Sequence, residues 1–84
     1  MLTLLYFAWV RESIGTDSET ITLPAAITTV SDLLDWLATR SPGHAQALAD
    51  RSRIHVAVDQ QFARPESPII GAREIALFPP VTGG

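Results

Sequence analysis

Hydrophobic and polar positions divide the first part of the chain into two predicted strands. Residues 2–10 are rich in β-forming and aromatic side chains and are apolar at both odd and even positions. A strand with one face in water alternates polar and apolar residues, so this run predicts a central strand covered on both faces. Residues 11–17 contain Gly15 and predict a turn. Residues 18–23 alternate and predict an outer strand.

The clearest helix follows this second strand. Thr29 is placed to cap it, and Asp32, three residues later, approximates a capping box. The apolar residues that follow the cap share one face at helical spacing: Val30, Leu33, Leu34 and Leu37. Ser41-Pro42-Gly43 predicts the end of this helix, and residues 44–50 predict a second, shorter one.

The second half of the chain predicts three further extended segments. Residues 54–59 alternate as a strand, and residues 60–70 predict a loop that contains a short edge strand at Phe62. Residues 71–73 predict a turn, and residues 74–78 predict the last strand.

This order of elements predicts an α+β fold. One amphipathic helix cannot cover two faces, so we expect a mixed sheet of four to five strands with the main helix on one face and a short second helix beside it. If the first and last strands are central and adjacent, the sheet is of the β-grasp (ubiquitin-like) type. We therefore expect one domain over residues 1–78 and an extended C-terminal tail over residues 79–84.

Composition excludes several function classes. The net charge is −3 and the six basic residues are all arginines scattered along the chain, so a nucleic-acid-binding face is not expected. The absence of cysteine excludes thiolate chemistry, and two histidines, His44 and His55, are too few for a transition-metal site. No segment approaches the roughly 20 consecutive apolar residues needed to span a bilayer, so we expect a soluble, cytoplasmic protein. A length of 84 residues favours a carrier, adaptor or small subunit over a complete enzyme.

The last six residues contain the most informative motif. Pro79 and Pro80 follow the predicted last strand directly, and prolines both block further strand pairing and stiffen the chain. Gly83 and Gly84 then end the chain. Residues 80–84 could reach roughly 16 Å at about 3.3 Å per residue. Because glycine has no Cβ, such a tail fits a narrow channel and presents an unhindered carboxylate.

With these residues, the sequence resembles the small subunits of molybdopterin synthase, which are sulfur carriers of the ubiquitin-like β-grasp superfamily. The resemblance spans essentially the whole chain. It rests on Phe7-Ala8, Arg11-Glu12 and Gly15-Thr16-Asp17 near the start, on Ala57-Val58 and Gln60 in the middle, and on residues 74–84, EIALFPPVTGG, at the end. The terminal FPPVTGG is its most specific motif.

The resemblance implies a reaction cycle at Gly84. A ubiquitin-activating-type adenylyltransferase would adenylate the terminal carboxylate with ATP and Mg²⁺, and a persulfide protein would supply the sulfur of a thiocarboxylate. The tail, Pro80, Val81, Thr82 and Gly83 before Gly84, would then enter the large synthase subunit. There the sulfur would pass to cyclic pyranopterin monophosphate to form the molybdopterin dithiolene. The chain itself would bind no cofactor or metal, and two copies of each subunit would form a heterotetramer.

Side chains for docking are suggested in two ways. From the pattern alone, the sheet face without a helix would carry Leu5, Phe7 and Trp9, joined by Ala76 and Phe78, and an exposed apolar patch marks an interaction site. The resemblance implies that Phe7, Phe62 and Phe78 dock the partner, beside Pro79. Phe7 and Phe78 could instead fill a second small core. Arg11 could pair with a partner carboxylate or stay solvated. We assign no chemistry to His44 or His55.

The sequence departs from the family pattern at two places. Asp59 stands where asparagine is usual, and Arg73 brings a positive charge to a turn that is commonly more acidic. Three other functions stay open: a thiamine-pathway sulfur carrier, a ubiquitin-like protein modifier, and a β-grasp adaptor that works through its apolar face. The Phe-Pro-Pro-Val-Thr approach argues against the thiamine carrier. The absence of lysine prevents a modifier from building chains through its own side chains.

Overall fold

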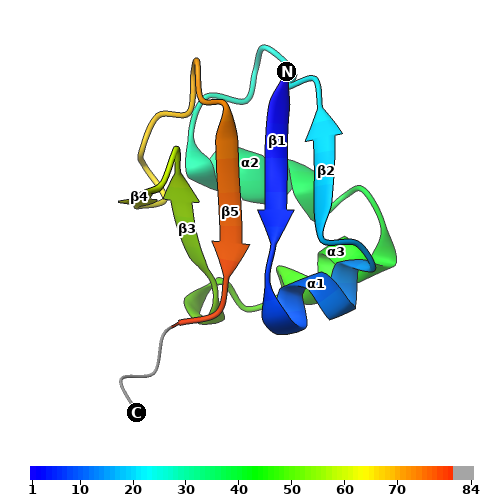
Figure 1. Ribbon diagram of the computed structural model, residues 1–84. Helices are drawn as coiled ribbons and strands as arrows, with labels where there is room; N and C mark the ends of the chain where they lie inside the picture. Colours follow the sequence, from blue (N-terminus) through cyan, green and yellow to red (C-terminus); the bar gives the residue numbers. More distant parts are fainter. Residues whose placement is uncertain (81–84) are drawn as a thin grey trace.

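The sheet of the computed structural model contains five strands in the order β2-β1-β5-β3-β4 (Figure 1). The structure describes residues 1–80, and the predicted positions 81–84 of the tail lie outside this range. The strands are β1 (Leu2–Tyr6), β2 (Ser18–Ile21), β3 (His55–Val58), β4 (Gln61–Ala63) and β5 (Glu74–Phe78). β1 and β5 are adjacent and parallel at the centre, and the other pairs are antiparallel. This arrangement confirms the β-grasp prediction.

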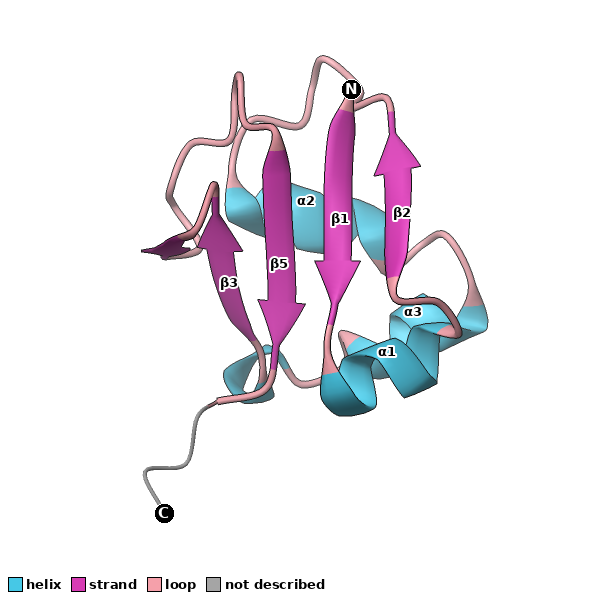
Figure 2. Cartoon of the chain, in the orientation of Figure 1, coloured by secondary structure: helices cyan, strands magenta, loops and turns pink. Residues whose placement is uncertain are grey.

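The longest helix, α2 (Val30–Leu37), packs across one face of the sheet (Figure 2). Its cap is the predicted one: the Thr29 hydroxyl accepts from the Asp32 N–H at 3.1 Å, and the Asp32 carboxylate accepts from the Thr29 N–H at 3.2 Å. All four apolar residues expected on one face of the helix are buried. They pack against alternate residues of the two central strands, Leu2, Leu4, Tyr6, Ile75 and Leu77.

The first strand is shorter than predicted. It ends at Tyr6, and α1 (Ala8–Ile14) occupies positions that we expected to continue the strand and then form a turn. The chain changes direction at Ala8, whose φ of 54° lies in the left-handed region. α1 buries Val10 and ends at Gly15, which adopts a φ of 98° and donates its N–H to the Arg11 carbonyl. The prediction of a nine-residue strand covered on both faces is therefore wrong.

The second predicted helix exists with different bounds. α3 covers Pro42–Ala47, and Ser41 caps it by accepting from the His44 N–H at 3.1 Å. α3 lies beside α1 at one end of the sheet (Figure 2). The two helices approach so closely at Gly43 that a Cβ there would overlap the Ser13 carbonyl oxygen. A 3₁₀ helix, Arg51–Arg53, connects α3 to β3.

β3 and β4 form a tight hairpin at the edge of the sheet. Val58 pairs with Gln61, so its loop is the two residues Asp59 and Gln60, both with positive φ, as a type I′ turn requires. The Asp59 carboxylate also accepts from the backbone N–H groups of Arg73 and Glu74, at 3.0 and 2.9 Å. Asp59, which stands where the family usually has asparagine, therefore ties this turn to the start of β5.

Candidate functional site

The tail leaves the sheet from its central region. β5 lies between β1 and β3, ends at Phe78, and is followed by Pro79, which is half-buried, and Pro80, which is exposed. Because β5 is held on both sides, its last residue is a fixed point from which the tail starts. The predicted tail residues Val81, Thr82, Gly83 and Gly84 lie outside the described residues.

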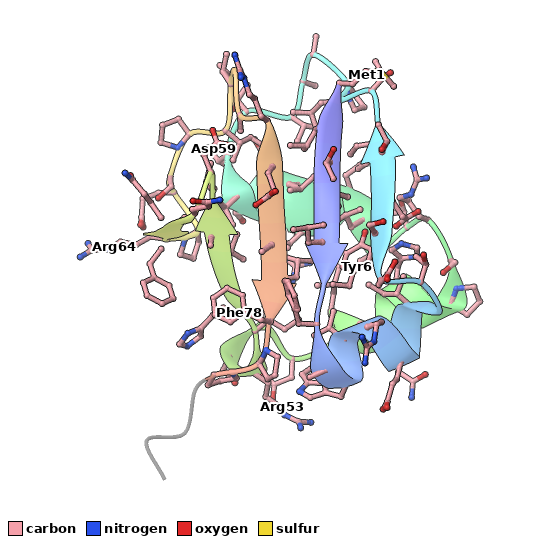
Figure 3. The ribbon with its side chains drawn as sticks, viewed as in Figure 1. Met1, Tyr6, Arg53, Asp59, Arg64 and Phe78 are labelled. Atoms are coloured by element: carbon pink, nitrogen blue, oxygen red, sulfur yellow. The ribbon has the colours of Figure 1, made fainter. Side chains whose placement is uncertain are left out.

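Three rings gather beside this exit, on the sheet face opposite α2. We call His55, Phe62 and Phe78 the aromatic cluster. The ring centroids of Phe62 and Phe78 are 5.9 Å apart, and His55 lies edge-on to both, at 6.4 Å from Phe62 and 5.9 Å from Phe78. These distances are typical of favourable aromatic pairs. Figure 3 shows Phe78 at the end of β5 from which the chain continues into the tail.

Strand register extends the aromatic cluster into a wider apolar face. Leu5, Ala76, Ala57 and Phe62 lie in one row across β1, β5, β3 and β4, because Leu5 pairs with Ala76, Ala76 with Ala57, and Ala57 with Phe62. The first three are half-buried, while 78% of Phe62 is exposed. Small alanines flanked by large exposed rings form a shallow apolar surface, which is the composition of a protein interface.

The other predicted docking residues occupy different places. Phe7 lies between β1 and α1, is 47% exposed, and donates its N–H to the Leu77 carbonyl at 3.1 Å. That exposure leaves it at the surface and not in a second core. Arg11 is exposed on α1, and the described residues offer it no ion pair.

Trp9 does not lie on the sheet face as predicted. Its position belongs to α1, where it is half-buried, and the Arg53 guanidinium lies over its ring, 4.9 Å from the centroid. The reason is the early end of β1: a residue in a helix does not follow the two-residue alternation that placed it with Leu5 and Phe7.

A polar network on the opposite side of the molecule was not predicted. The Tyr6 hydroxyl donates to Oε2 of Glu19 at 2.6 Å, and Nε2 of the buried His44 lies 2.8 Å from the same oxygen. Nδ1 of His44 is 2.7 Å from the Ser41 hydroxyl, and Arg40 lies 3.8 Å from Oε1. Since a carboxylate only accepts, we assign the proton to Nε2, which leaves Nδ1 to accept from Ser41.

The network joins β1, β2 and α3, so its role is to hold the helical end of the molecule on the sheet. Partial burial would raise the pKa of Glu19, but hydrogen bonds from Tyr6 and His44 and the charge of Arg40 outweigh it and lower that pKa. Burial raises the pKa of the Tyr6 hydroxyl, and its bond to Glu19 adds to the effect, so Tyr6 remains a donor.

Within residues 1–80, no group of three or more His, Asp or Glu side chains is arranged to hold a metal ion. None of the helices described is both long and apolar enough to cross a membrane.

The sequence matches a known family along nearly its whole length. A model described as the ThiS family covers residues 4–84. The molybdopterin synthase sulfur carrier subunit of Escherichia coli (strain K12) is 39% identical over 84 residues, which cover all of both chains. The protein of the same name in Homo sapiens is 36% identical, over 96% of this chain and 91% of the relative.

Solved structures share the fold. Small archaeal modifier protein 1 of Haloferax volcanii superposes with a TM-score of 0.69 at 27% identity, over 95% of this chain and 97% of that one. A putative molybdopterin converting factor, subunit 1, from Pyrococcus furiosus superposes with a TM-score of 0.74, over 95% of this chain and 97% of that one. Its 24% identity supports the fold alone. The family match and the full-length identity to sulfur carrier subunits together place this chain in the ThiS family, among the proteins similar to the small subunit of molybdopterin synthase.

Proposed function

We propose that this chain is the sulfur carrier of a molybdopterin synthase and that Gly84 is its reacting residue. The observation that carries the proposal is that Phe78 links the aromatic cluster to the start of the tail. This residue belongs to the aromatic cluster, and it is also the last strand residue before Pro79 and Pro80. A partner that binds the aromatic cluster would therefore receive the tail at a fixed distance from its own surface.

The proposed chemistry needs only the terminal carboxylate of this chain. Ionised at neutral pH, it attacks the α-phosphate of ATP and displaces pyrophosphate, which gives an acyl-adenylate. A persulfide sulfur then attacks the acyl carbon, AMP leaves, and reductive cleavage of the S–S bond by a thiol leaves a thiocarboxylate. In the large subunit, the thiocarboxylate sulfur finally attacks cyclic pyranopterin monophosphate to give a thioester. Water hydrolyses this thioester, which leaves the sulfur on the pterin, towards the molybdopterin dithiolene, and restores the Gly84 carboxylate.

The catalytic groups belong to the partners in this proposal. The adenylyltransferase supplies the ATP and Mg²⁺ site, and the large subunit supplies the acid–base groups and the pterin pocket. This chain is then the sulfur-donating subunit and not an enzyme by itself. Because activation consumes ATP, we propose that the cycle runs in the cytoplasm, with two copies of each subunit in the assembled synthase.

The direct test is the intact mass of the chain after incubation with an adenylyltransferase, ATP, Mg²⁺ and a sulfur source. Replacing one carboxyl oxygen by sulfur adds about 16 Da. A variant without Gly83 and Gly84 is the control and should gain nothing. If the full chain gains no mass while a known sulfur carrier does so under the same conditions, the proposal is wrong.

A protein modifier is the second candidate, and the similarity to small archaeal modifier protein 1 is the observation that favours it. Both roles begin with an acyl-adenylate, so the product distinguishes them. A modifier would form an amide with a lysine of a target, which survives reduction and denaturation on a gel. A sulfur carrier would return to the free carboxylate when a large subunit and the pterin substrate are added.

A further inference from the structure

A groove next to the aromatic cluster opens between α2 and the β3–β4 hairpin. Its volume is about 610 Å³. Apolar residues form most of its lining, among them Val30 and Leu34 of α2 and Val56 of β3. Phe62 and Ala63 of β4 line it on the side of the sheet edge. The groove shares His55 and Phe62 with the aromatic cluster, whereas Phe78 does not line it.

The strand beside the groove has an unused edge. The Asp59 N–H donates to the Glu74 carbonyl at 2.8 Å, so the hydrogen-bonding groups of Ala57, two residues earlier on β3, also face β5. Ala57 is the residue opposite Phe62, and its pair with Phe62 is therefore not hydrogen-bonded. It follows that the backbone N–H and C=O of Phe62 point outward, where another strand could pair with them.

The rim of the groove carries one positive charge without an ion pair among the residues described, although the chain as a whole carries −3. Arg51 and Arg64 both line it. Arg51 is held by Asp35, with 2.7 Å between Nη1 and Oδ1, while Arg64 is exposed and has no ion pair among the residues described. The charge of Arg64 therefore borders a groove whose lining is otherwise mainly apolar, which favours an occupant that is apolar with an acidic residue beside Arg64.

We infer that the groove binds an extended acidic–apolar segment of a partner protein, which adds to β4 as a further strand. The segment's backbone would bond to the N–H and C=O of Phe62, its apolar side chains would enter the groove, and a carboxylate would pair with Arg64. Strand addition obtains affinity from such main-chain bonds and specificity from pockets for alternate side chains.

The probe is the peptide acetyl-Asp-Asp-Val-Leu-Val-Asp-amide, added to the full ¹⁵N-labelled chain and followed by amide chemical shifts. We expect saturable shifts at residues 61–64 and in the first turn of α2. A twin peptide with lysine in place of each aspartate should bind at least about threefold more weakly, since even exposed ion pairs contribute measurably. No saturable shift at these residues, or equal affinity for the two peptides, would overturn the inference.

Two matched pairs of variants separate the strand bond from the charge. Phe62→Pro and Phe62→Ala both lose the ring, but only proline loses the outward N–H, and proline is tolerated on an edge at such a position. We expect Phe62→Pro to bind the peptide about twofold to tenfold more weakly than Phe62→Ala. Equal affinities would refute strand addition.

For the charge, Arg64→Glu should weaken binding about threefold or more, while Arg73→Glu, the same change at an exposed arginine outside the groove, should not. This second pair remains decisive if Phe62→Pro does not fold. Loss of binding in both arginine variants would show a general charge effect and not the proposed site.

Discussion

At the scale of single residues, Glu19 shows how a polar side chain can connect three elements. It lies on β2, accepts from Tyr6 of β1 and from His44 of α3, and keeps Arg40 near its second oxygen. Tyr6 and His44 are buried, so removal of the carboxylate would leave both without this acceptor. An unsatisfied buried donor costs about 1–3 kcal/mol, which makes Glu19 a structural residue in spite of its charge.

Glu19 should make stability depend on pH in the acid range. Its pKa is lower in the folded protein than the ordinary 4.5, so its contribution is present above that value and is lost as pH falls through the folded pKa. We expect Glu19→Gln to reduce the free energy of unfolding by about 1 kcal/mol at pH 7 and progressively less below pH 4.5.

Urea unfolding of both proteins between pH 7 and pH 3 measures this difference. Glu66→Gln, which neutralises an exposed carboxylate, is the control and should track the wild type across the range. A Glu19→Gln deficit that stays constant down to pH 3 would contradict the assignment.

Phe78 should contribute to partner binding more than to stability. It is only half-buried and its neighbours are the exposed Phe62 and His55, so truncation removes little from the core. We expect Phe78→Ala to weaken binding to a large synthase subunit by about 2 kcal/mol or more, as for an interface anchor. Isothermal titration gives the dissociation constant, and Ile70→Ala, at a residue 77% exposed in the turn before β5, is the control. An unchanged dissociation constant for Phe78→Ala would assign this ring to the fold instead.

Residue types near the site could be predicted, but their neighbours could not. Phe78 was expected on the helix-free sheet face from its place in the last predicted strand, and Phe62 was implied by the family resemblance. His55 did not stand out, since its contact with both rings depends on the register that sets it opposite Phe78. The same holds for His44 and Glu19, which are 25 positions apart. Such pairs are fixed by tertiary packing, which no local pattern contains.

At the scale of elements, α1 shows where local patterns lead to a wrong answer. Residues 2–10 form one continuous apolar run, and a run of this kind has no periodicity that separates a strand from a buried helix. The chain changes from strand to helix inside it, at Ala8. The start and the buried face of α2 were predicted correctly, because Thr29 and Asp32 cap it and its apolar residues recur at helical spacing. Its end was not, since Ser41 and Pro42 begin α3. β5 was predicted correctly because its run is short and is bounded by a turn and by prolines.

The contact between α1 and α3 should not tolerate a side chain at Gly43. A Cβ there would overlap the backbone oxygen of Ser13, and backbone cannot move as easily as the end of a side chain. We therefore expect Gly43→Ala to lower the free energy of unfolding by about 1–3 kcal/mol, although alanine is normally the better helix former. Chemical denaturation measures the change, with Gln46→Ala on the exposed side of α3 as the control. If Gly43→Ala were as stable as the wild type, the two helices would have to lie farther apart than described.

At the scale of the whole molecule, the two parts of the protein should respond independently to mutation. The core lies between α2 and the sheet, whereas the proposed reacting group is at the end of the tail, after Pro79 and Pro80. A change near the end of the tail should therefore alter chemistry without altering the fold. The clearest case is Gly83, where the proposed channel in the partner leaves no space for a side chain.

We expect Gly83→Val to slow sulfur transfer by about a hundredfold, because displacement of a reacting group by about 1 Å can cost that much. The midpoint of thermal unfolding should stay that of the wild type. The same is expected of the control Ala26→Val, which also introduces a valine, but at an exposed turn of the folded domain. Single-turnover kinetics with thiocarboxylated protein and a large subunit measures the rate without the activation step. If Gly83→Val transferred sulfur at the wild-type rate, the channel would not select for glycine. If it unfolded at a lower temperature, the tail would have to contribute to the folded body, and the separation of reacting end from folded support would not hold.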